Sequence, residues 1–292
     1  MRLYDLDAGL WFDETWVHVN ATTIPVGHIM SIPNPQDQHF LFDLMIRLSL
    51  LAFGDSVWAL RLPAVLFGVG SLWTLYLFGR EVSSSLEVLL SVGLLTFSYH
   101  HVWFSQNARG YTALLFWTLL SSWLLLKALD RAEIKMWLLY AVTVALGMFT
   151  HMTMGFVVLA HLGLYVWRVI RRRVEAGDVD WRGFVFGFCL AGALSLLLYT
   201  PALPEIVSGT IGEERTVNTV EGWTNPLWTL LEFVRGMRVG FAGGVFAVAA
   251  LITLGLGLLS YLRTSPAVMV LLFVPAATQT AFVIGLGRYL RP

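Results

Sequence analysis

The feature of this sequence most able to do chemistry is an adjacent pair of carboxylates, Asp13 and Glu14. They end the run Trp11-Phe-Asp-Glu14, in a polar N-terminal segment ahead of the first long apolar block. A carboxylate can act as a general base when it lies within hydrogen-bond reach of the group that loses a proton. A solvated turn, or a helix whose first turn carries acidic residues beside its positive dipole end, would explain the same pair without chemistry. The pair therefore needs support from the elements that position it.

The composition makes those elements membrane helices. Hydrophobic residues make up 57% of the chain, charged residues only 13%, and the mean hydropathy is +0.70. Soluble domains typically carry about a quarter charged residues. The formal net charge is zero, so the chain lacks the basic surface with which proteins neutralise nucleic-acid phosphates. The one cysteine, Cys189, cannot form an internal disulfide and is interpreted as a packing residue.

Long runs without Asp, Glu, Lys or Arg predict the spans. They cover residues 62–79, 88–108, 110–126, 136–167, 183–204, 239–262 and 264–287. Most match the roughly 17 to 25 residues that cross hydrocarbon as a helix. The run 136–167 is too long for one crossing and has Thr150-His-Met-Thr153 in its middle, so we expect a tight hairpin of two short spans there. The prediction is an all-α, polytopic membrane helix bundle of about eight transmembrane helices.

Basic residues orient this bundle. With that number of crossings one side receives Arg80, Lys127, Arg131, Lys135, the basic loop 168–182 and Arg263. Positive loop residues stay preferentially in the cytoplasm. We therefore predict a multi-pass protein of the plasma (inner) membrane. Its N-terminal segment, the turn 100–109, the tip at His151 and the loop 201–238 would face the periplasm or the cell exterior.

This orientation divides the chain into two predicted domains. Residues 1–56 form an extracytoplasmic acidic segment, and residues 57–292 form the transmembrane helical bundle. Within the first domain, the apolar residues of 40–53 are interrupted by Asp43, Arg47 and Ser49. That pattern favours an amphipathic helix lying in the membrane interface over one that crosses it.

Four ordered stretches carry a resemblance to a known family. They are Trp11-Phe-Asp-Glu14; Leu51-Ala-Phe-Gly-Asp-Ser-Val-Trp-Ala-Leu-Arg-Leu-Pro63, continued by Leu75-Tyr-Leu-Phe-Gly-Arg80; Val102-Trp-Phe-Ser-Gln-Asn-Ala-Arg-Gly-Tyr111; and Phe149-Thr-His-Met152. Their order and spacing resemble the C-type glycosyltransferase superfamily. More narrowly, they resemble bacterial relatives of the dolichyl-phosphate-mannose protein mannosyltransferases.

The resemblance implies a multi-span enzyme that uses a polyisoprenyl-phosphate sugar. In such families a membrane helix precedes the acidic motif and further helices follow the final Arg-Tyr, so we expect this chain to be a fragment. Two positions depart from the family pattern. Relatives often have Pro-Pro where this chain has Gln36-Asp-Gln-His-Phe40, and often a glutamate at the position of Asn107.

Sugar transfer from a lipid phosphate needs a base and a cationic clamp. By resemblance, Asp13 is the general base, with Glu14 beside it binding the acceptor or a metal ion. Direct inversion at the sugar carbon needs one essential carboxylate, unlike the paired groups of retaining glycosidases. A guanidinium presents a fork of N–H groups matched to phosphate oxygens, and Arg109 is the first candidate for this contact.

The remaining substrate-binding candidates are Arg61, Arg288, Asn107, His39 and His151. No cofactor is expected. No fixed ligand spacing among His39, His101 and His151 supports a metal, and a divalent cation stays open. Arg109 could instead anchor its span at the interface, and His151 could be polar only because it lies in a turn.

The sequence thus predicts an inverting membrane glycosyltransferase acting on the extracytoplasmic face. Its partners would be a polyisoprenyl-phosphate sugar donor, membrane lipid, and a protein, lipid or glycan acceptor. A lipid or small-molecule transporter or flippase is the alternative, and an inactive truncated fragment is a third. Ion-coupled transport usually requires ionisable groups at mid-membrane, and the predicted spans contain almost none.

Overall fold

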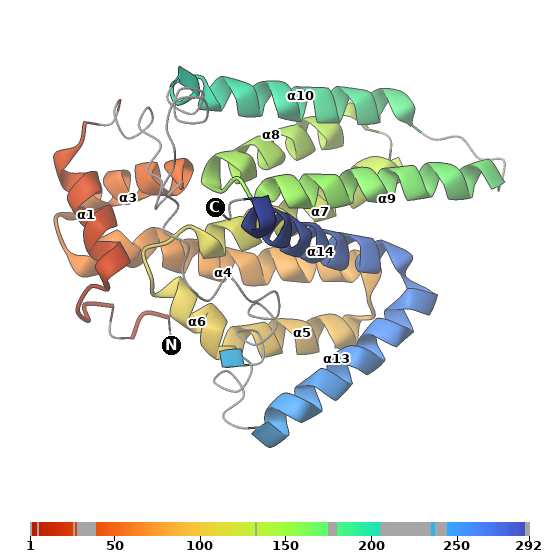
Figure 1. The fold of residues 1–292 in the computed structure, drawn as a ribbon, viewed down its shortest axis with the longest axis horizontal. Helices are drawn as coiled ribbons and strands as arrows, with labels where there is room; N and C mark the ends of the chain where they lie inside the picture. The colour runs from red at the N-terminus through yellow and green to blue at the C-terminus, as the bar shows by residue number, and fades with distance from the viewer. Residues whose placement is uncertain are drawn as a thin grey trace. The chain divides into compact units, whose positions relative to one another are not determined.

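A computed structural model describes residues 2–4, 6–25, 27, 39–131, 133–174, 180–204, 235–236 and 244–289, and every regular element within them is helical (Figure 1). The chain divides into two compact units. Unit 1 comprises Met1–Gly155 and Arg172–Gly212, and unit 2 comprises Phe156–Arg171 and Glu213–Pro292. The predicted all-helical class is confirmed. Most of the predicted loop 201–238 lies outside the described residues.

The core of unit 1 contains two parallel helices, α4 (Val57–Val82) and α7 (Tyr111–Arg131). At one end Thr112 Oγ1 donates to the carbonyl of Ala64 at 3.1 Å, and at the other end Lys127 pairs with Glu81 at 2.7 Å. They run in the same direction because α5 (Ser85–Phe97) and α6 (Tyr99–Ser105) return the chain between them.

Two further helices extend this layer, α8 (Ile134–Thr150) and α10 (Trp181–Tyr199). Trp137 Nε1 donates to Asp180 Oδ2 near the start of both helices, and the Tyr199 hydroxyl donates to the carbonyl of Met148 near their ends, so α8 and α10 are parallel. Glycine at position 183 makes room for this packing, since a Cβ there would overlap the Trp137 indole. In contrast, α8 is antiparallel to α7.

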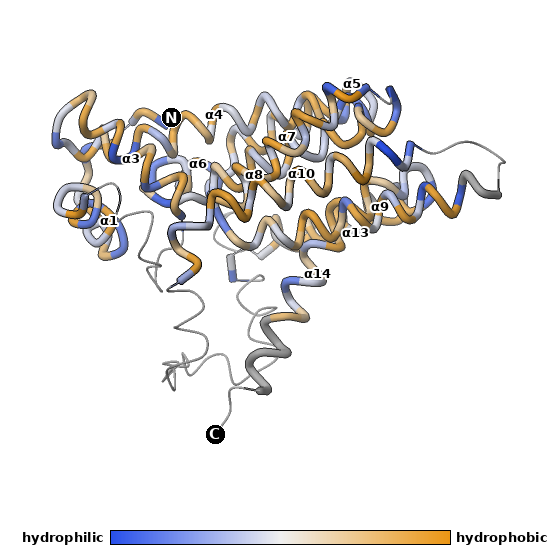
Figure 2. Tube along the Cα trace, turned by 90° about the horizontal axis from the view of Figure 1, so that it is seen from above, coloured by the Kyte–Doolittle hydropathy of each residue, from blue (hydrophilic) through white to orange (hydrophobic). Residues whose placement is uncertain are grey.

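Unit 1 therefore has two chemically different ends. One, the basic end, carries Arg80, Lys127, Arg131, Lys135 and Arg182. The opposite end carries α1 (Phe12–Thr23) and α3 (Phe40–Phe53), and hydrophobic residues predominate between them (Figure 2). The structure thus confirms that these basic residues share one side. Which side faces the cytoplasm stays a prediction.

The helix α3 has the residue range predicted from its sequence pattern. Its buried Phe42, Ile46 and Leu50 pack with Ala59 and Leu60 of α4 in one hydrophobic cluster. Arg47 on the same helix donates to the carbonyls of Ala21 and Thr22, which lie in the last turn of α1 and have no partner within that helix. The position of α3 in a membrane interface stays a prediction.

Unit 2 contains most of α9 (Met154–Val174) together with α13 (Gly244–Thr264) and α14 (Pro266–Tyr289). Phe156 of α9 packs against Phe282 of α14, with ring centroids 5.6 Å apart. Val270 of α14 lies beside Gly163 of α9. These contacts build the second unit from helices that are distant in sequence.

Five helical segments of the described chain are long and apolar enough to cross a membrane: Val57–Val82, Tyr111–Arg131, Met154–Arg171, Trp181–Tyr199 and Gly244–Thr264. Shorter apolar helices cover Ser85–Phe97, Ile134–Thr150 and Pro266–Phe282. The chain is a polytopic membrane protein, and about eight crossings stays a prediction.

One predicted run is corrected, and the break predicted within another is confirmed. Residues 88–108, predicted as one span, divide into α5 and α6 because Ser98 ends the first helix and its Oγ accepts the backbone N–H of His101, capping the second. The predicted break within 136–167 is confirmed, since α8 ends at Thr150 and α9 begins at Met154. The second helix is longer than the short span predicted.

Candidate active site

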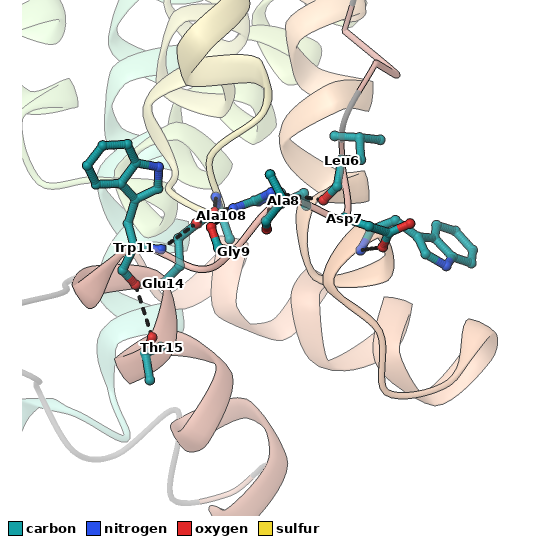
Figure 3. A network of polar contacts seen from close by, with 10 residues as sticks. Leu6, Asp7, Ala8, Gly9, Trp11, Glu14, Thr15 and Ala108 are labelled. Atoms are coloured by element: carbon teal, nitrogen blue, oxygen red, sulfur yellow. Dashed lines mark hydrogen bonds and ion pairs between the residues drawn. The ribbon is translucent and has the colours of Figure 1, made fainter.

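A buried ion pair organises the α1 end of unit 1. Glu14, in the first turn of α1, is fully buried, and its carboxylate accepts from Arg61 Nε at 2.9 Å and Nη2 at 2.6 Å (Figure 3). Arg61 also donates to the carbonyls of Leu6, Ala8 and Gly9. These contacts use every N–H group of a guanidinium. The arrangement favours a positioning role for Arg61 over the predicted contact with substrate.

Glu14 also joins two separate parts of the chain. Its Oε2 accepts the backbone N–H of Trp11 at 3.2 Å, closing the first turn of α1 (Figure 3). Its Oε1 accepts the backbone N–H of Ala108 at 2.8 Å, in the loop between α6 and α7. Arg109 directly follows Ala108 in that loop, as Asp13 directly precedes Glu14 in α1. The buried Glu14 carboxylate therefore fixes the backbone that carries Asp13 and the backbone that carries Arg109.

Asp13 and Arg109 form this second ion pair. Arg109 Nη1 lies 2.8 Å from Asp13 Oδ2, with 24% and 56% of the two side chains exposed. The Arg109 guanidinium also lies over the Tyr111 ring, 5.1 Å from its centroid. Its Nε is buried and donates to no partner among the described residues. The base and the phosphate clamp predicted from the sequence thus lie together at the surface.

Beside Arg109 lie two of the predicted histidines. The rings of His39 and His151 are 4.7 Å apart, and Tyr111 is 5.6 Å from the first and 6.2 Å from the second. His39 Nδ1 lies 3.2 Å from the carbonyl of Thr150, so this nitrogen carries a proton. His151 Nδ1 accepts the backbone N–H of Thr153 at 3.1 Å, which leaves the ring proton on Nε2. The two imidazoles therefore have defined tautomers.

The surroundings of this pair favour neutral rings. Burial, helped by the neighbouring His151 and Arg109 and opposed by the Thr150 carbonyl, lowers the pKa of His39 to about 3. Burial also lowers the pKa of His151, and the charge of Arg109 adds to the effect. At neutral pH the cluster presents one fixed cation and two uncharged hydrogen-bonding rings.

Asn107 supplies an unused acceptor in the same loop. The residue is 4% exposed, and its Oδ1 is buried without a hydrogen-bond partner among the described residues. Its backbone carbonyl accepts the N–H of Arg109 at 2.7 Å. A buried amide oxygen left unpaired costs about 1 to 3 kcal/mol, so this atom is suited to accept a hydrogen bond from a bound molecule.

Two further polar residues singled out in the sequence are Arg288 and His101. Arg288 belongs to α14 in unit 2, and its side chain is outside the described part. His101 is buried between Arg2, whose Nη2 lies 2.7 Å from Nδ1, and Ser71, whose Oγ lies 2.8 Å from Nε2. Burial and Arg2 lower its pKa to about 4. The described residues contain no group of three or more His, Cys, Asp and Glu with metal-binding geometry.

The sequence reasoning missed three participants. Tyr111 was part of a recognised motif, yet its contact with Arg109 was not foreseen. Gly110 permits the approach of His39, because a Cβ there would lie 2.8 Å from His39 Nδ1. The backbone N–H of Ala108 holds Glu14. Only the glycine gives a signal in sequence, as a residue without a side chain between two functional neighbours.

Comparison with known protein families supplies the chemistry that fits this geometry. Residues 37–204 match the family described as dolichyl-phosphate-mannose-protein mannosyltransferase. No curated protein and no solved structure gave a significant match. The match covers more than half of the chain and includes Arg61, Asn107 and Arg109 as well as both histidines of the cluster. An enzyme is thereby favoured over a transporter. The chain belongs to the dolichyl-phosphate-mannose-protein mannosyltransferase family, membrane glycosyltransferases that use a polyprenyl-phosphate sugar as donor.

Proposed function

We propose that this protein transfers a sugar from a polyprenyl-phosphate donor with inversion at the anomeric carbon, using Asp13 as the general base and Arg109 as the phosphate ligand. The observation that carries the proposal is the 2.8 Å contact between these two side chains at the exposed α1 end of unit 1. Both are held by backbone that Glu14 fixes. The predicted extracytoplasmic location is supported by the basic residues gathered at the opposite end.

The base and the clamp are in contact with each other, so the donor must separate them. An exposed ion pair contributes about 0 to 1 kcal/mol, and a phosphate competing for Arg109 therefore meets little resistance. The donor phosphate replaces Asp13 on the guanidinium and takes up the unused Nε. The freed Asp13 carboxylate then faces the acceptor.

In the transfer step the acceptor oxygen attacks the anomeric carbon from the face opposite the phosphate. Its O–H proton passes to Asp13, and the bond between the sugar carbon and the phosphate oxygen breaks. The electron pair of that bond stays on the polyprenyl phosphate, where Arg109 stabilises the growing negative charge. Water or protein acids are not needed to balance the step.

The neighbouring groups serve the sugar in this proposal. His39 and His151 are uncharged at neutral pH and suit hydroxyl groups better than phosphate oxygens. Asn107 Oδ1 accepts from a further hydroxyl. Glu14 and Arg61 are positioning residues, because their hydrogen bonds are used within the protein. The residues predicted to act at the site thus divide into those that bind the sugar and those that position the backbone.

Asp13→Asn tests the base. We expect transfer from a radiolabelled polyprenyl-phosphate mannose to acceptors of the cell envelope to fall by about 10² to 10⁴. Donor affinity should be retained, because the amide neither holds nor repels the phosphate. The measurement is initial rate and donor binding in membranes that contain equal amounts of each variant.

Asp55→Asn is the matched control. Asp55 is also an exposed carboxylate in a close ion pair, 2.6 Å from His18, with 66% and 27% of the two side chains exposed. Its loss should leave transfer unchanged. Equal rates for Asp13→Asn and the unmodified protein would remove Asp13 from the proposed role.

A further inference from the structure

Aromatic rings form a continuous arc beside the Asp13–Arg109 pair. Trp11 lies 6.2 Å from Trp103 in an edge-to-face arrangement, Trp103 lies 4.8 Å from Phe104, and Phe104 lies 5.1 Å from Tyr111. Arg109 covers Tyr111. The arc joins the start of α1 to α6 and to the start of α7, and so connects residues on both sides of the ion pair.

Trp11 is the most exposed member of the arc and also firmly held. Its side chain leaves 60% of the residue exposed, and the indole points away from the polar network in Figure 3. Its backbone N–H is held by the buried Glu14, and its carbonyl accepts from Thr15 Oγ1 at 3.1 Å. An exposed indole is thus carried on fixed backbone two residues before Asp13.

An indole face at this place fits one class of ligand well. The C–H groups on one face of a pyranose ring are apolar and carry slight positive charge, and the face of an aromatic ring carries the negative part of its quadrupole. The hydroxyl groups around the ring need hydrogen-bonding partners, and the imidazoles of His39 and His151 lie beside Tyr111 at the other end of the arc. A flat aromatic surface combined with uncharged polar groups therefore favours a sugar over a lipid tail.

Membrane proteins also gather tryptophans at the membrane interface, which is the competing explanation. That explanation requires no particular neighbours. Trp181 is an instructive comparison: it is also 60% exposed, but it lies at the basic end of unit 1, beside Arg182. Trp11 differs from it in being linked through ring contacts to Tyr111, over which the candidate phosphate ligand Arg109 lies.

We propose that Trp11, supported by Trp103, is a stacking platform for a pyranose ring at the site of transfer. The inference rests on the proposed function, because it places the sugar beside Asp13. The sugar is either that of the donor or one carried by the acceptor. The two sources share the same chemistry and are separated by the experiment.

The experiment compares Trp11→Leu and Trp11→Phe in the full chain reconstituted in lipid nanodiscs. Binding is measured for mannosyl-phosphoryl-undecaprenol and for undecaprenyl phosphate, which lacks the sugar, and transfer is measured with methyl α-mannoside as the acceptor. Leucine keeps an apolar side chain, although a smaller one, and removes the π face, whereas phenylalanine keeps a smaller π face. We expect Trp11→Leu to lose about ten-fold and Trp11→Phe to lose less.

A loss confined to the glycosylated donor identifies the donor sugar, whereas unchanged donor binding with a raised KM for methyl α-mannoside identifies the acceptor sugar. Equal weakening of both lipids, or the same result from Trp181→Leu, would overturn the platform. So would a Trp11→Leu variant that matches the unmodified protein in every assay. Asp13→Asn, assayed in parallel, reports the proposed function separately, since it lowers the rate and spares binding.

Discussion

Asp13 and Glu14 are neighbours in sequence and occupy opposite environments. Glu14 is fully buried and accepts from Arg61 and from the backbone of Trp11 and Ala108. Asp13 leaves 56% of its side chain exposed and holds a single cation, Arg109. Two identical functional groups, one residue apart, are thus suited to different work. A saturated carboxylate holds the backbone, and one with a displaceable partner is free to accept a proton.

The energetics of the two pairs sharpen this difference. Removing one partner of a buried ion pair typically costs about 3 to 5 kcal/mol, since the other charge stays buried and unpaired. Removing one partner of an exposed pair costs about 0 to 1 kcal/mol. Substitutions at the two positions should therefore separate stability from activity.

The largest effect on stability is expected from Glu14→Gln. Arg61 would lose its counter-ion while remaining buried, so the free energy of unfolding should fall by about 3 to 5 kcal/mol. Asp13→Asn should change it by less than about 1 kcal/mol. The apparent Tm of both purified variants, taken at one scan rate, measures this contrast.

A double variant controls for the buried charge itself. Glu14→Leu combined with Arg61→Leu removes both charges and should be more stable than either single variant, because neither ion is left alone. The comparison breaks if Glu14→Gln melts like the unmodified protein yet cannot transfer sugar. Glu14 would then act in chemistry as the sequence suggested.

Many residues of this site could be predicted from the sequence, but the separate roles of Asp13 and Glu14 could not. The pairing of Asp13 with Arg109 followed from motifs that fall in order along the chain. In a helix, consecutive side chains point about 100° apart, so only one of two adjacent acids can face a given partner. Which one faces Arg61 depends on how α1 docks onto α4, and that is a tertiary property.

The helix bounds were likewise predictable only where the sequence pattern alone determines them. The bounds of α3 were predictable because its apolar periodicity is bordered by residues that do not share it. The division of α5 from α6 was not, because Ser98 lies inside an apolar run and acts through its side-chain oxygen on His101. A prediction based on runs without charged residues does not detect a helix cap made by one uncharged serine.

Gly110→Ala tests whether the exposed pair depends on precise backbone placement. The added Cβ would lie 2.8 Å from His39 Nδ1, so either the imidazole or the loop carrying Arg109 must shift. Overpacking of this kind costs about 1 to 3 kcal/mol. We expect donor affinity to fall about ten-fold with a smaller loss of stability than Glu14→Gln causes.

Gly93→Ala is the matched control, because a Cβ at that helical position meets nothing within 4 Å. It should leave donor affinity unchanged and, as alanine in place of glycine within a helix, should not lower stability. Normal donor affinity in Gly110→Ala would mean that Arg109 tolerates displacement. The distinction between a fixed and a displaceable pair would then lose its geometric basis.

The pH dependence of stability extends the comparison from carboxylates to imidazoles. Burial lowers the pKa of His39 to about 3 and that of His101 to about 4, from an unfolded value of 6.5. Below pH 6.5 the unfolded chain binds protons that the folded chain does not, so each group lowers stability as the pH falls toward its folded pKa. Above about pH 7 neither contributes.

Each imidazole should therefore steepen the loss of stability between pH 6.5 and pH 4 by at most about 1.4 kcal/mol per pH unit. His39→Asn and His101→Asn should each flatten this slope and leave the pH dependence above pH 7 as it was. The measurement is apparent Tm against pH for the single and double variants. If neither substitution changes the slope of Tm against pH, His39 and His101 both take up protons in the folded protein. The assignment of uncharged imidazoles beside Arg109 would then be wrong.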